Sequence, residues 1–293
     1  KLTKDVTSTS WKHRLGKQQA SQIFSNPNWL VAKEKANMQE PQTVLITAGG
    51  SGIGRAMAEA FHASGYLVAV TDVDKEALHA ITLEMPDVMC FNADVCNEAD
   101  MQAFNAALHD SWNRLDVVIA NAGIAGPTAA LADVDFADWQ RCLAVNLDGA
   151  FLTCRIAAKW MSAQKKGVIT LTSSTAGLFG YPFRSPYATA KWGIIGLMKT
   201  LAMELGPDGI RVNAICPGAV SGDRMDRVIA NEARTRGISE DKLRSGYADC
   251  VSLKSFVDAN DIADMALYLA SDKARMVSGM AMAVDGHTEK VTL

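Results

Sequence analysis

Short apolar runs alternate with longer segments of helical periodicity along most of this chain. The intervening segments, such as GRAMAEAFHASG and NEADMQAFNAALHDSW, have helical length. Because the runs are apolar throughout rather than alternating, they predict strands covered on both faces, which is typical of βαβ units in a parallel sheet. We therefore expect an α/β fold in one domain: a doubly wound, mostly parallel seven-stranded sheet with helices on both faces. The seven runs are 43–47, 67–71, 88–91, 116–120, 167–172, 210–215 and 280–284.

Residues 1–37 depart from this pattern, because they are polar and basic with little apolar periodicity. Met38 opens a stretch that resembles a natural domain start, so we expect an N-terminal extension or arm over 1–37 and a single domain over 38–293. Three interpretations of 1–37 stay open: an upstream extension, an arm that grips a partner subunit, and an organelle-targeting peptide.

The composition restricts the partners of the chain. A net charge of -3 over 293 residues with no basic stripe argues against nucleic acid. No apolar run approaches the ~18 residues that span a bilayer, so no membrane partner is expected. The six cysteines form no CxxC pair and the five histidines lie in no metal motif. We expect reduced thiols, no bound metal and a cytoplasmic protein.

The glycine-rich segment TAGGSGIG, Thr47 to Gly54, ends the first predicted strand and opens the first predicted helix. Glycines at such a junction let the backbone approach a pyrophosphate, whose charge the helix N-terminus stabilises. A purely structural turn is the alternative. The candidate cofactor-binding residues of this loop are Gly49, Ser51, Gly52, Ile53 and Gly54.

Asp72 ends the second predicted strand, 18 residues past Gly54. A carboxylate in this place accepts hydrogen bonds from both adenosine ribose hydroxyls and repels a 2′-phosphate, which favours NAD over NADP. No Arg or Lys lies inside the loop, although Arg55 follows it immediately. In the alternative interpretation, Asp72 caps the next helix.

Tyr187 and Lys191 lie four residues apart at the start of a helical segment, so both project from one face. A free phenol has a pKa near ~10 and is a poor base at neutral pH. A lysine ammonium one turn away and a positively charged nicotinamide both favour the phenolate. Tyr187 is therefore the candidate acid/base, and a chance Tyr–Lys pair on the surface is the alternative.

These motifs, in this order, resemble the short-chain dehydrogenase/reductase family, in the branch with TGxxxGxG and YxxxK motifs, from Met38 to about Gly286. The resemblance implies a Rossmann-like fold and further cofactor-binding residues. ADV resembles the adenine-binding pair, NAG the segment after the fourth strand, and RVNAICPG the segment whose Pro-Gly turn lies beside the nicotinamide. The residues so implied are Asp94, Val95, Asn121, Ala122, Gly123, Pro217 and Gly218.

The same resemblance implies four catalytic residues. Tyr187 exchanges the proton of the substrate hydroxyl, and Lys191 binds the nicotinamide ribose and lowers the pKa of Tyr187. Ser174, thirteen residues before Tyr187, holds the substrate oxygen, with Ser173 as the less favoured candidate. Asn146 holds a water that connects Lys191 to solvent.

Two positions depart from the family pattern. Ala48 stands where the family has its first loop glycine, and Gly222 stands where it often has a threonine that hydrogen-bonds the nicotinamide carboxamide. We expect backbone groups such as those of Val220, a further candidate cofactor-binding residue, to replace that contact.

The sequence thus predicts an NAD-dependent oxidoreductase that interconverts a small secondary alcohol and its ketone. Alternatives are a 3-oxoacyl thioester reductase and a non-catalytic NAD-binding regulator. Arg184, Arg224 and Arg227 lie in expected substrate segments and fit an anionic substrate, although such arginines are more often solvated or at interfaces. Apolar helical segments at 137–163 and after Lys191 resemble the family's subunit contacts, which implies a homotetramer or homodimer.

Overall fold

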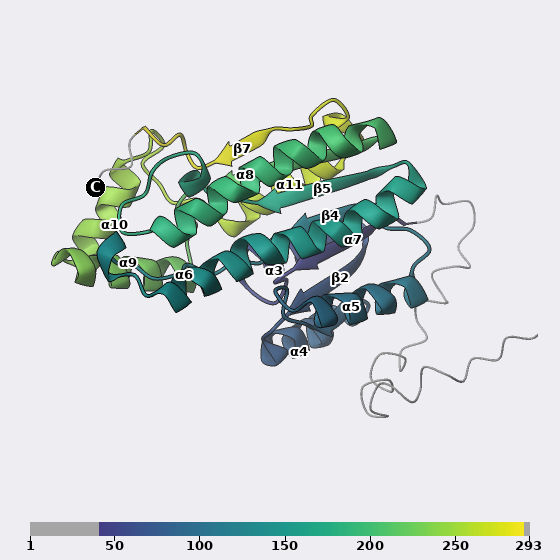
Figure 1. The fold of residues 1–293 in the computed structure, drawn as a ribbon, viewed down its shortest axis with the longest axis horizontal. Coiled ribbons are helices and arrows are strands. Elements are labelled where there is room, and N and C mark those ends of the chain that lie inside the picture. The colour runs from purple at the N-terminus through teal and green to yellow at the C-terminus, as the bar shows by residue number, and fades with distance from the viewer. Residues whose placement is uncertain (1–40, 290–293) are drawn as a thin grey trace, which may run out of the picture.

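The computed structural model describes residues 41–289, and these form one seven-stranded sheet covered by helices (Figure 1). The strand order is β3-β2-β1-β4-β5-β6-β7, and every neighbouring pair is parallel. The predicted doubly wound sheet is therefore confirmed, and it is parallel throughout rather than mostly parallel. The predicted arm at 1–37 lies outside the described residues. The strands are β1 (Thr43–Thr47), β2 (Leu67–Asp72), β3 (Met89–Asn92), β4 (Val117–Ala120), β5 (Gly167–Thr172), β6 (Ile210–Pro217) and β7 (Ala281–Val284).

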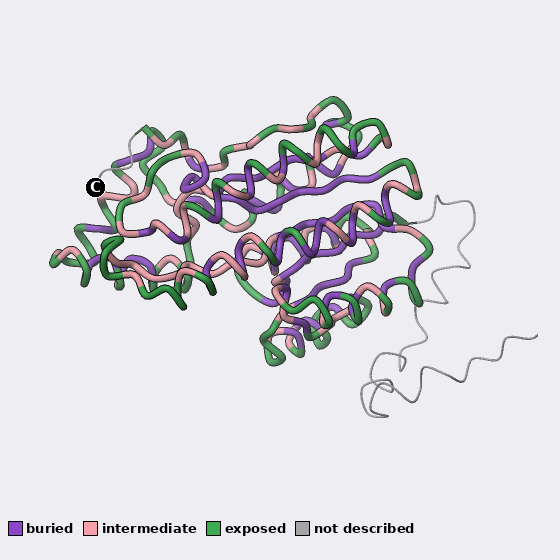
Figure 2. The backbone as a smooth tube through the Cα atoms, in the orientation of Figure 1, coloured by how far each residue is buried: buried purple, intermediate pink, exposed green. Residues whose placement is uncertain are grey.

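Two hydrophobic layers cover the sheet, one on each face. Side chains of α5, α7 and α8 pack against one face, and those of α3, α4 and α11 pack against the other. The central strands are buried between them, as Figure 2 shows, because both faces of each strand contact a helix layer. The helices are α3 (Gly52–Ala63), α4 (Lys75–Glu84), α5 (Glu98–Ser111), α6 (Phe136–Leu143), α7 (Gly149–Gln164), α8 (Ser185–Leu205), α9 (Asp223–Arg236), α10 (Glu240–Asp249) and α11 (Ala259–Ala270).

The strand order reverses between β1 and β4, which are neighbours although two strands separate them in the sequence. In a doubly wound sheet, ligands bind at the carboxyl ends of the strands beside such a reversal. The loop after β1 and the segments after β4 and β5 all begin at this edge. Most of the predicted site residues are therefore brought to one edge of the sheet.

The helical segment expected at 137–163 is interrupted. A π-helical turn at Ala144–Asp148 separates α6 from α7, and it contains the predicted catalytic residue Asn146. Single π turns inside helices are uncommon and occur often at functional sites. Beyond β6, α9 and α10 form a small separate cluster around Ile229 and Leu243.

Three further properties belong to residues 41–289. None of their helices combines the length and apolarity needed to cross a membrane. No group of three or more His, Cys, Asp or Glu side chains among them could hold a metal ion. All six cysteines are free.

Candidate functional site

The loop after β1 holds its residues in unusual backbone conformations. Ala48 has φ 51°, in the left-handed region that favours glycine, so the departure from the family pattern falls where a glycine would be least strained. No residue with a side chain fits at Gly54, because a Cβ there would overlap the Ala48 carbonyl oxygen. Gly52 has φ 53° and open space around it. The loop is therefore tightly packed at Gly54, whereas the space around Gly52 is open.

Asp72 connects the end of β2 to this loop. One carboxylate oxygen accepts a hydrogen bond from the Gly50 N–H at 2.9 Å, and the other accepts one from the Asp74 N–H at 3.0 Å. Asp74, not Asp72, caps α4, by accepting hydrogen bonds from the Glu76 and Ala77 N–H groups. The helix-cap interpretation of Asp72 is therefore wrong.

Arg55, the cation that follows the loop, is occupied by two acidic side chains. It forms ion pairs with Glu59 on the same helix and with Glu84 at the end of α4. Because this guanidinium is already paired with two carboxylates, an additional anion would have to compete with them for it.

Asn121 connects three elements after β4. Its amide nitrogen donates to the carbonyl oxygens of Thr47 and Ala48, and its amide oxygen accepts a hydrogen bond from Thr172 at the end of β5. The Thr47 hydroxyl in turn accepts hydrogen bonds from the Asn121 and Ala122 N–H groups. Thr47 is a supporting residue that we did not predict, although its place as the last residue of β1 is visible in the sequence.

Asp94 and Val95, the pair that resembles the adenine-binding residues of the family, follow β3. The Asp94 carboxylate accepts hydrogen bonds from the N–H and the thiol of Cys96, which fixes this turn. Val95 is buried and occupies the space that a side chain at Gly149 would need.

The turn after β6 is fixed by β7. The Gly218 N–H donates to the Val284 carbonyl oxygen at 3.0 Å, and a Cβ on Gly218 would meet Asp285 at 2.8 Å. Val220 forms an isolated bridge with Val257, made by the N–H and carbonyl groups of its neighbours Ala219 and Ser221. Gly222 has φ 125°, so a threonine there would be strained.

Tyr187 and Lys191 project together from the first turns of α8. The buried Lys191 ammonium donates to the Thr172 carbonyl oxygen at the end of β5, at 2.9 Å. It also lies 5.6 Å from the centroid of the Tyr187 ring. The ammonium is therefore held by the sheet edge at a fixed distance from the phenol.

The two serines after β5 have different surroundings. The Ser173 hydroxyl is buried and donates to the Lys191 backbone carbonyl at 2.9 Å, so it joins β5 to α8. The Ser174 hydroxyl accepts a hydrogen bond from the Ala176 N–H at 3.1 Å and also interacts with the Tyr187 hydroxyl. Of the two serines, Ser174 is the one beside the phenol.

The charges around Tyr187 change its acidity. Burial raises the pKa of Tyr187, but the charges of Lys191, Arg224 and Arg184, together with the Ser174 hydroxyl, bring this pKa below its ordinary value of 10.0. The pKa of Lys191 is also lowered, by burial first and by Arg224, against the opposing effect of Tyr187.

Asn146 lies in the π-helical turn with its amide oxygen buried and without a hydrogen-bond partner in the described part of the chain. Its amide nitrogen donates to the carbonyl oxygens of Ile124 and Cys142 at 3.0 and 2.9 Å, which fixes the orientation of the amide. A side chain at Gly123 would meet the amide oxygen at 2.6 Å and the Lys191 ammonium at 3.3 Å. Asn146 and Lys191 therefore flank the same glycine, and the amide oxygen is an acceptor that still needs a donor.

Comparison with known proteins places this geometry in a family. A family model described as enoyl-(acyl carrier protein) reductase matches residues 47–287. The chain is 34% identical to a 2-(S)-hydroxypropyl-CoM dehydrogenase of Xanthobacter autotrophicus, over 86% of this chain and 98% of the relative. The chain is a short-chain dehydrogenase/reductase.

Two solved structures of this family share its architecture. An NAD+-bound xylitol dehydrogenase superposes with a TM-score of 0.80 at 27% identity, over 84% of this chain and 98% of the other. An actinorhodin polyketide ketoreductase with NADPH superposes with a TM-score of 0.81 at 28% identity, over 85% of this chain and 97% of the other. This short-chain dehydrogenase/reductase is thus an oxidoreductase from a family that acts on CH–OH groups with a nicotinamide cofactor.

Two arginines of this short-chain dehydrogenase/reductase lie around Tyr187. The Arg184 guanidinium carbon lies 4.8 Å from the centroid of the Tyr187 ring, and that of Arg224 lies 6.0 Å from it. Arg184 is buried and donates to the Ala125 carbonyl oxygen at 3.0 Å, whereas Arg224 is exposed at the start of α9. No contact of Arg227 with Tyr187 is found among the described residues.

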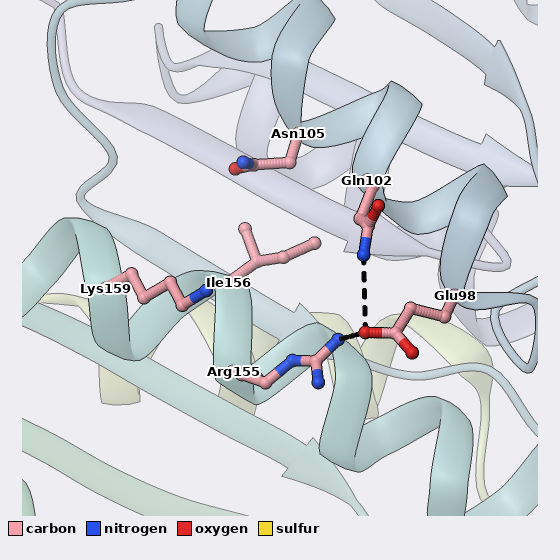
Figure 3. A pocket seen from close by; sticks show the side chains of 6 residues that line it. All are labelled: Glu98, Gln102, Asn105, Arg155, Ile156 and Lys159. Carbon is pink, nitrogen blue, oxygen red and sulfur yellow. Dashed lines mark hydrogen bonds and ion pairs between the residues drawn. The ribbon is translucent and has the colours of Figure 1, made fainter.

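A shallow pocket of about 140 Å³ lies between α5 and α7, apart from these residues (Figure 3). An ion pair between Glu98 and Arg155 crosses it, and Gln102 donates to the same Glu98 oxygen. None of the predicted site residues lines this pocket.

Proposed function

We propose that this short-chain dehydrogenase/reductase is an NAD-dependent enzyme that interconverts a small secondary alcohol and its ketone. The observation that carries the proposal is the phenol of Tyr187, whose pKa is lowered beside the buried ammonium of Lys191 and the hydroxyl of Ser174. A phenol with a lowered pKa exchanges protons with an alcohol at neutral pH more readily than a free one.

In the proposed reaction each residue has one task. Tyr187 takes the proton of the substrate hydroxyl in the oxidative direction and returns it in the reductive one. Ser174 donates a hydrogen bond to the substrate oxygen and stabilises the charge that develops there. The nicotinamide, when bound, accepts or supplies the hydride. Lys191 holds the ribose of the cofactor and keeps the pKa of Tyr187 low.

The loop residues fit a dinucleotide. The open space at Gly52 and the N-terminus of α3 leave backbone N–H groups available to a pyrophosphate. The half-buried Asp72 carboxylate, fixed by two N–H donors, accepts the ribose hydroxyls and repels a 2′-phosphate. The pairing of Arg55 with Glu59 and Glu84 supports the same preference for NAD, because the cation that follows the loop is already paired with two carboxylates.

Asn146 completes the proposed proton path. Its buried amide oxygen lacks a donor, and it lies beside Gly123 together with the Lys191 ammonium. A water bound between the two would satisfy the oxygen and carry protons between Lys191 and solvent. The same proposal includes a cytoplasmic protein that assembles as a homotetramer or homodimer.

Two rival functions make different predictions. A 3-oxoacyl thioester reductase would normally use NADPH, against which Asp72 argues. A regulator that senses NAD without turnover would not need Ser174, Tyr187 and Lys191 in one group, and this chain keeps them together.

A substrate screen tests the proposal. Purified protein is incubated with a panel of secondary alcohols and ketones, with NAD and with NADP, and the absorbance of the reduced nicotinamide is followed. We expect turnover of at least one alcohol–ketone pair, faster with NAD. Turnover of 3-oxoacyl thioesters alone, or binding of NADH without turnover of any compound, would favour one of the rivals.

A further inference from the structure

The phenol of Tyr187 is surrounded by more positive charge than the proposed proton exchange needs. The guanidinium carbons of Arg184 and Arg224 lie 4.8 and 6.0 Å from its ring centroid, and the Lys191 ammonium lies 5.6 Å from it. The proposed reaction uses only Lys191 of these three cations to bind the cofactor. Arg184 and Arg224 are two further cations, and each has a donor without a partner among the described residues.

Arg184 and Arg224 differ in burial but share an unused hydrogen-bonding capacity. Arg184 is 94% buried (6% exposed), and its Nε has no hydrogen-bond partner within residues 41–289, which is costly for a buried cation. Arg224 forms no ion pair or hydrogen bond with any described residue. Apart from the Arg184 hydrogen bond to the Ala125 carbonyl oxygen and the contacts with the Tyr187 ring, the described residues leave the donors of these two guanidinium groups unused.

Two acidic groups of α9, Glu232 and Asp226, are already paired with other side chains. Glu232 is buried, forms an ion pair with Arg236 at 3.0 Å and accepts a hydrogen bond from Tyr247 at 2.6 Å. Asp226, on the same helix as Arg224, pairs with Arg244. The cation excess at Tyr187 is not neutralised by these carboxylates.

We propose that the substrate of this enzyme carries an anionic group, a carboxylate or a sulfonate, which Arg224 binds while the reacting carbon faces Tyr187. Guanidinium groups pair with such oxyanions through two parallel hydrogen bonds. Arg224 lies at the start of α9, where it is exposed and can meet a ligand, and the buried Arg184 adds to the positive potential. This inference rests on the proposed function and specifies its substrate class.

Matched ketones test the anionic group. Reduction of acetoacetate and 2-oxopropane-1-sulfonate is compared with that of neutral pentane-2,4-dione, using NADH and following its absorbance. For Arg224→Gln, we expect kcat/KM to fall about 10- to 100-fold for the acids and less than about threefold for the diketone. The control is Arg234→Gln, which removes a charge from the exposed side of the same helix and should alter none of the three values.

A binding measurement covers substrates that the panel does not include. The NADH-bound protein is titrated calorimetrically with butyrate and with propane-1-sulfonate. We expect binding of at least one of them, and we expect Arg224→Gln to raise its Kd about 10- to 100-fold. The ligand that binds more tightly identifies the anionic group of the substrate. Equal loss for acids and diketone in Arg224→Gln, or anion binding unchanged in that variant, would overturn the inference. Turnover of neutral ketones, with neither turnover nor binding of the anionic compounds, would overturn it and leave the proposed function standing.

Discussion

At the scale of single residues, the acidity of Tyr187 connects the structure to a measurable pH dependence. Alcohol oxidation needs the phenolate, so kcat should rise with pH through the pKa of Tyr187 and then level off; ketone reduction needs the phenol and should fall over the same range. Because Lys191, Arg224 and Arg184 outweigh burial, the inflection is expected below 10.0.

Lys191→Gln gives the matched test of that pH dependence. Lys191 is the strongest of the charges that lower the pKa of Tyr187, so its removal should move the inflection of the oxidation profile to higher pH. Stopped-flow measurement of single turnovers from pH 6 to 11 separates this shift from weaker cofactor binding. An inflection that does not move would mean that Tyr187 is not the titrating group.

A further prediction at the scale of single residues concerns Asp72 and the choice between NAD and NADP. Asp72→Ala removes the acceptor of the ribose hydroxyls and the repulsion of a 2′-phosphate, so we expect the Kd of NADH to rise about tenfold and that of NADPH to rise less or fall. Fluorescence titration measures both. An equal rise in the Kd values of NADH and NADPH would contradict the proposed preference for NAD.

The residue-scale features were unequally visible in the sequence. The spacing of Tyr187 and Lys191 was enough to predict that both lie on one helix face. The position of Asp72 at the end of a predicted strand was enough to predict that it lies at the carboxyl edge of the sheet. The different surroundings of Ser173 and Ser174, and the proximity of Arg224 to Tyr187, depend on packing between segments that are distant in the sequence. No local pattern encodes such contacts.

At the scale of elements, Asn121 is the connection that holds the loop after β1 in place. Asn121→Ala removes hydrogen bonds to Thr47, Ala48 and Thr172, and should reduce the free energy of unfolding by about 2–3 kcal/mol and weaken NADH binding. Urea denaturation and fluorescence titration provide the two values. Asn105→Ala, which removes one hydrogen bond to Trp160 between α5 and α7, is the control and should leave NADH binding unchanged.

The elements themselves were largely predictable. Each of the seven apolar runs became a strand within two residues of its expected bounds, because continuous apolar runs suit strands covered on both faces. The π-helical turn at Ala144–Asp148 was not predictable, since one extra residue in a helical turn leaves the apolar pattern almost unchanged. The caps of α4 and the hydrogen bonds of Asp72 likewise needed three-dimensional information.

At the scale of the whole molecule, exposed apolar side chains on the outer helix layer bear on assembly. Phe151 on α7 and Trp192 on α8 are about half exposed, and Met203 on α8 is more exposed still. Figure 1 shows these two helices crossing the same side of the sheet. If subunits associate through this layer, Phe151→Asp should shift the mass measured by light scattering from an oligomer toward a monomer.

A control for that prediction lies on the opposite layer. Leu83 on α4 is also exposed, and Leu83→Asp should leave the mass unchanged. A monomeric protein before mutation, or equal effects of the two substitutions, would contradict assembly through α7 and α8.

The proposed function of the whole molecule depends on the role of Tyr187 as the acid/base of an oxidoreductase. Tyr187→Phe removes only the hydroxyl and keeps the ring between Lys191, Arg184 and Arg224. The measurement is the turnover number of this variant with the best substrate of the screen, together with the Kd of NADH by fluorescence. We predict that kcat falls by at least about 1,000-fold while the Kd changes less than about threefold. Turnover within tenfold of the unmodified protein would contradict the assignment.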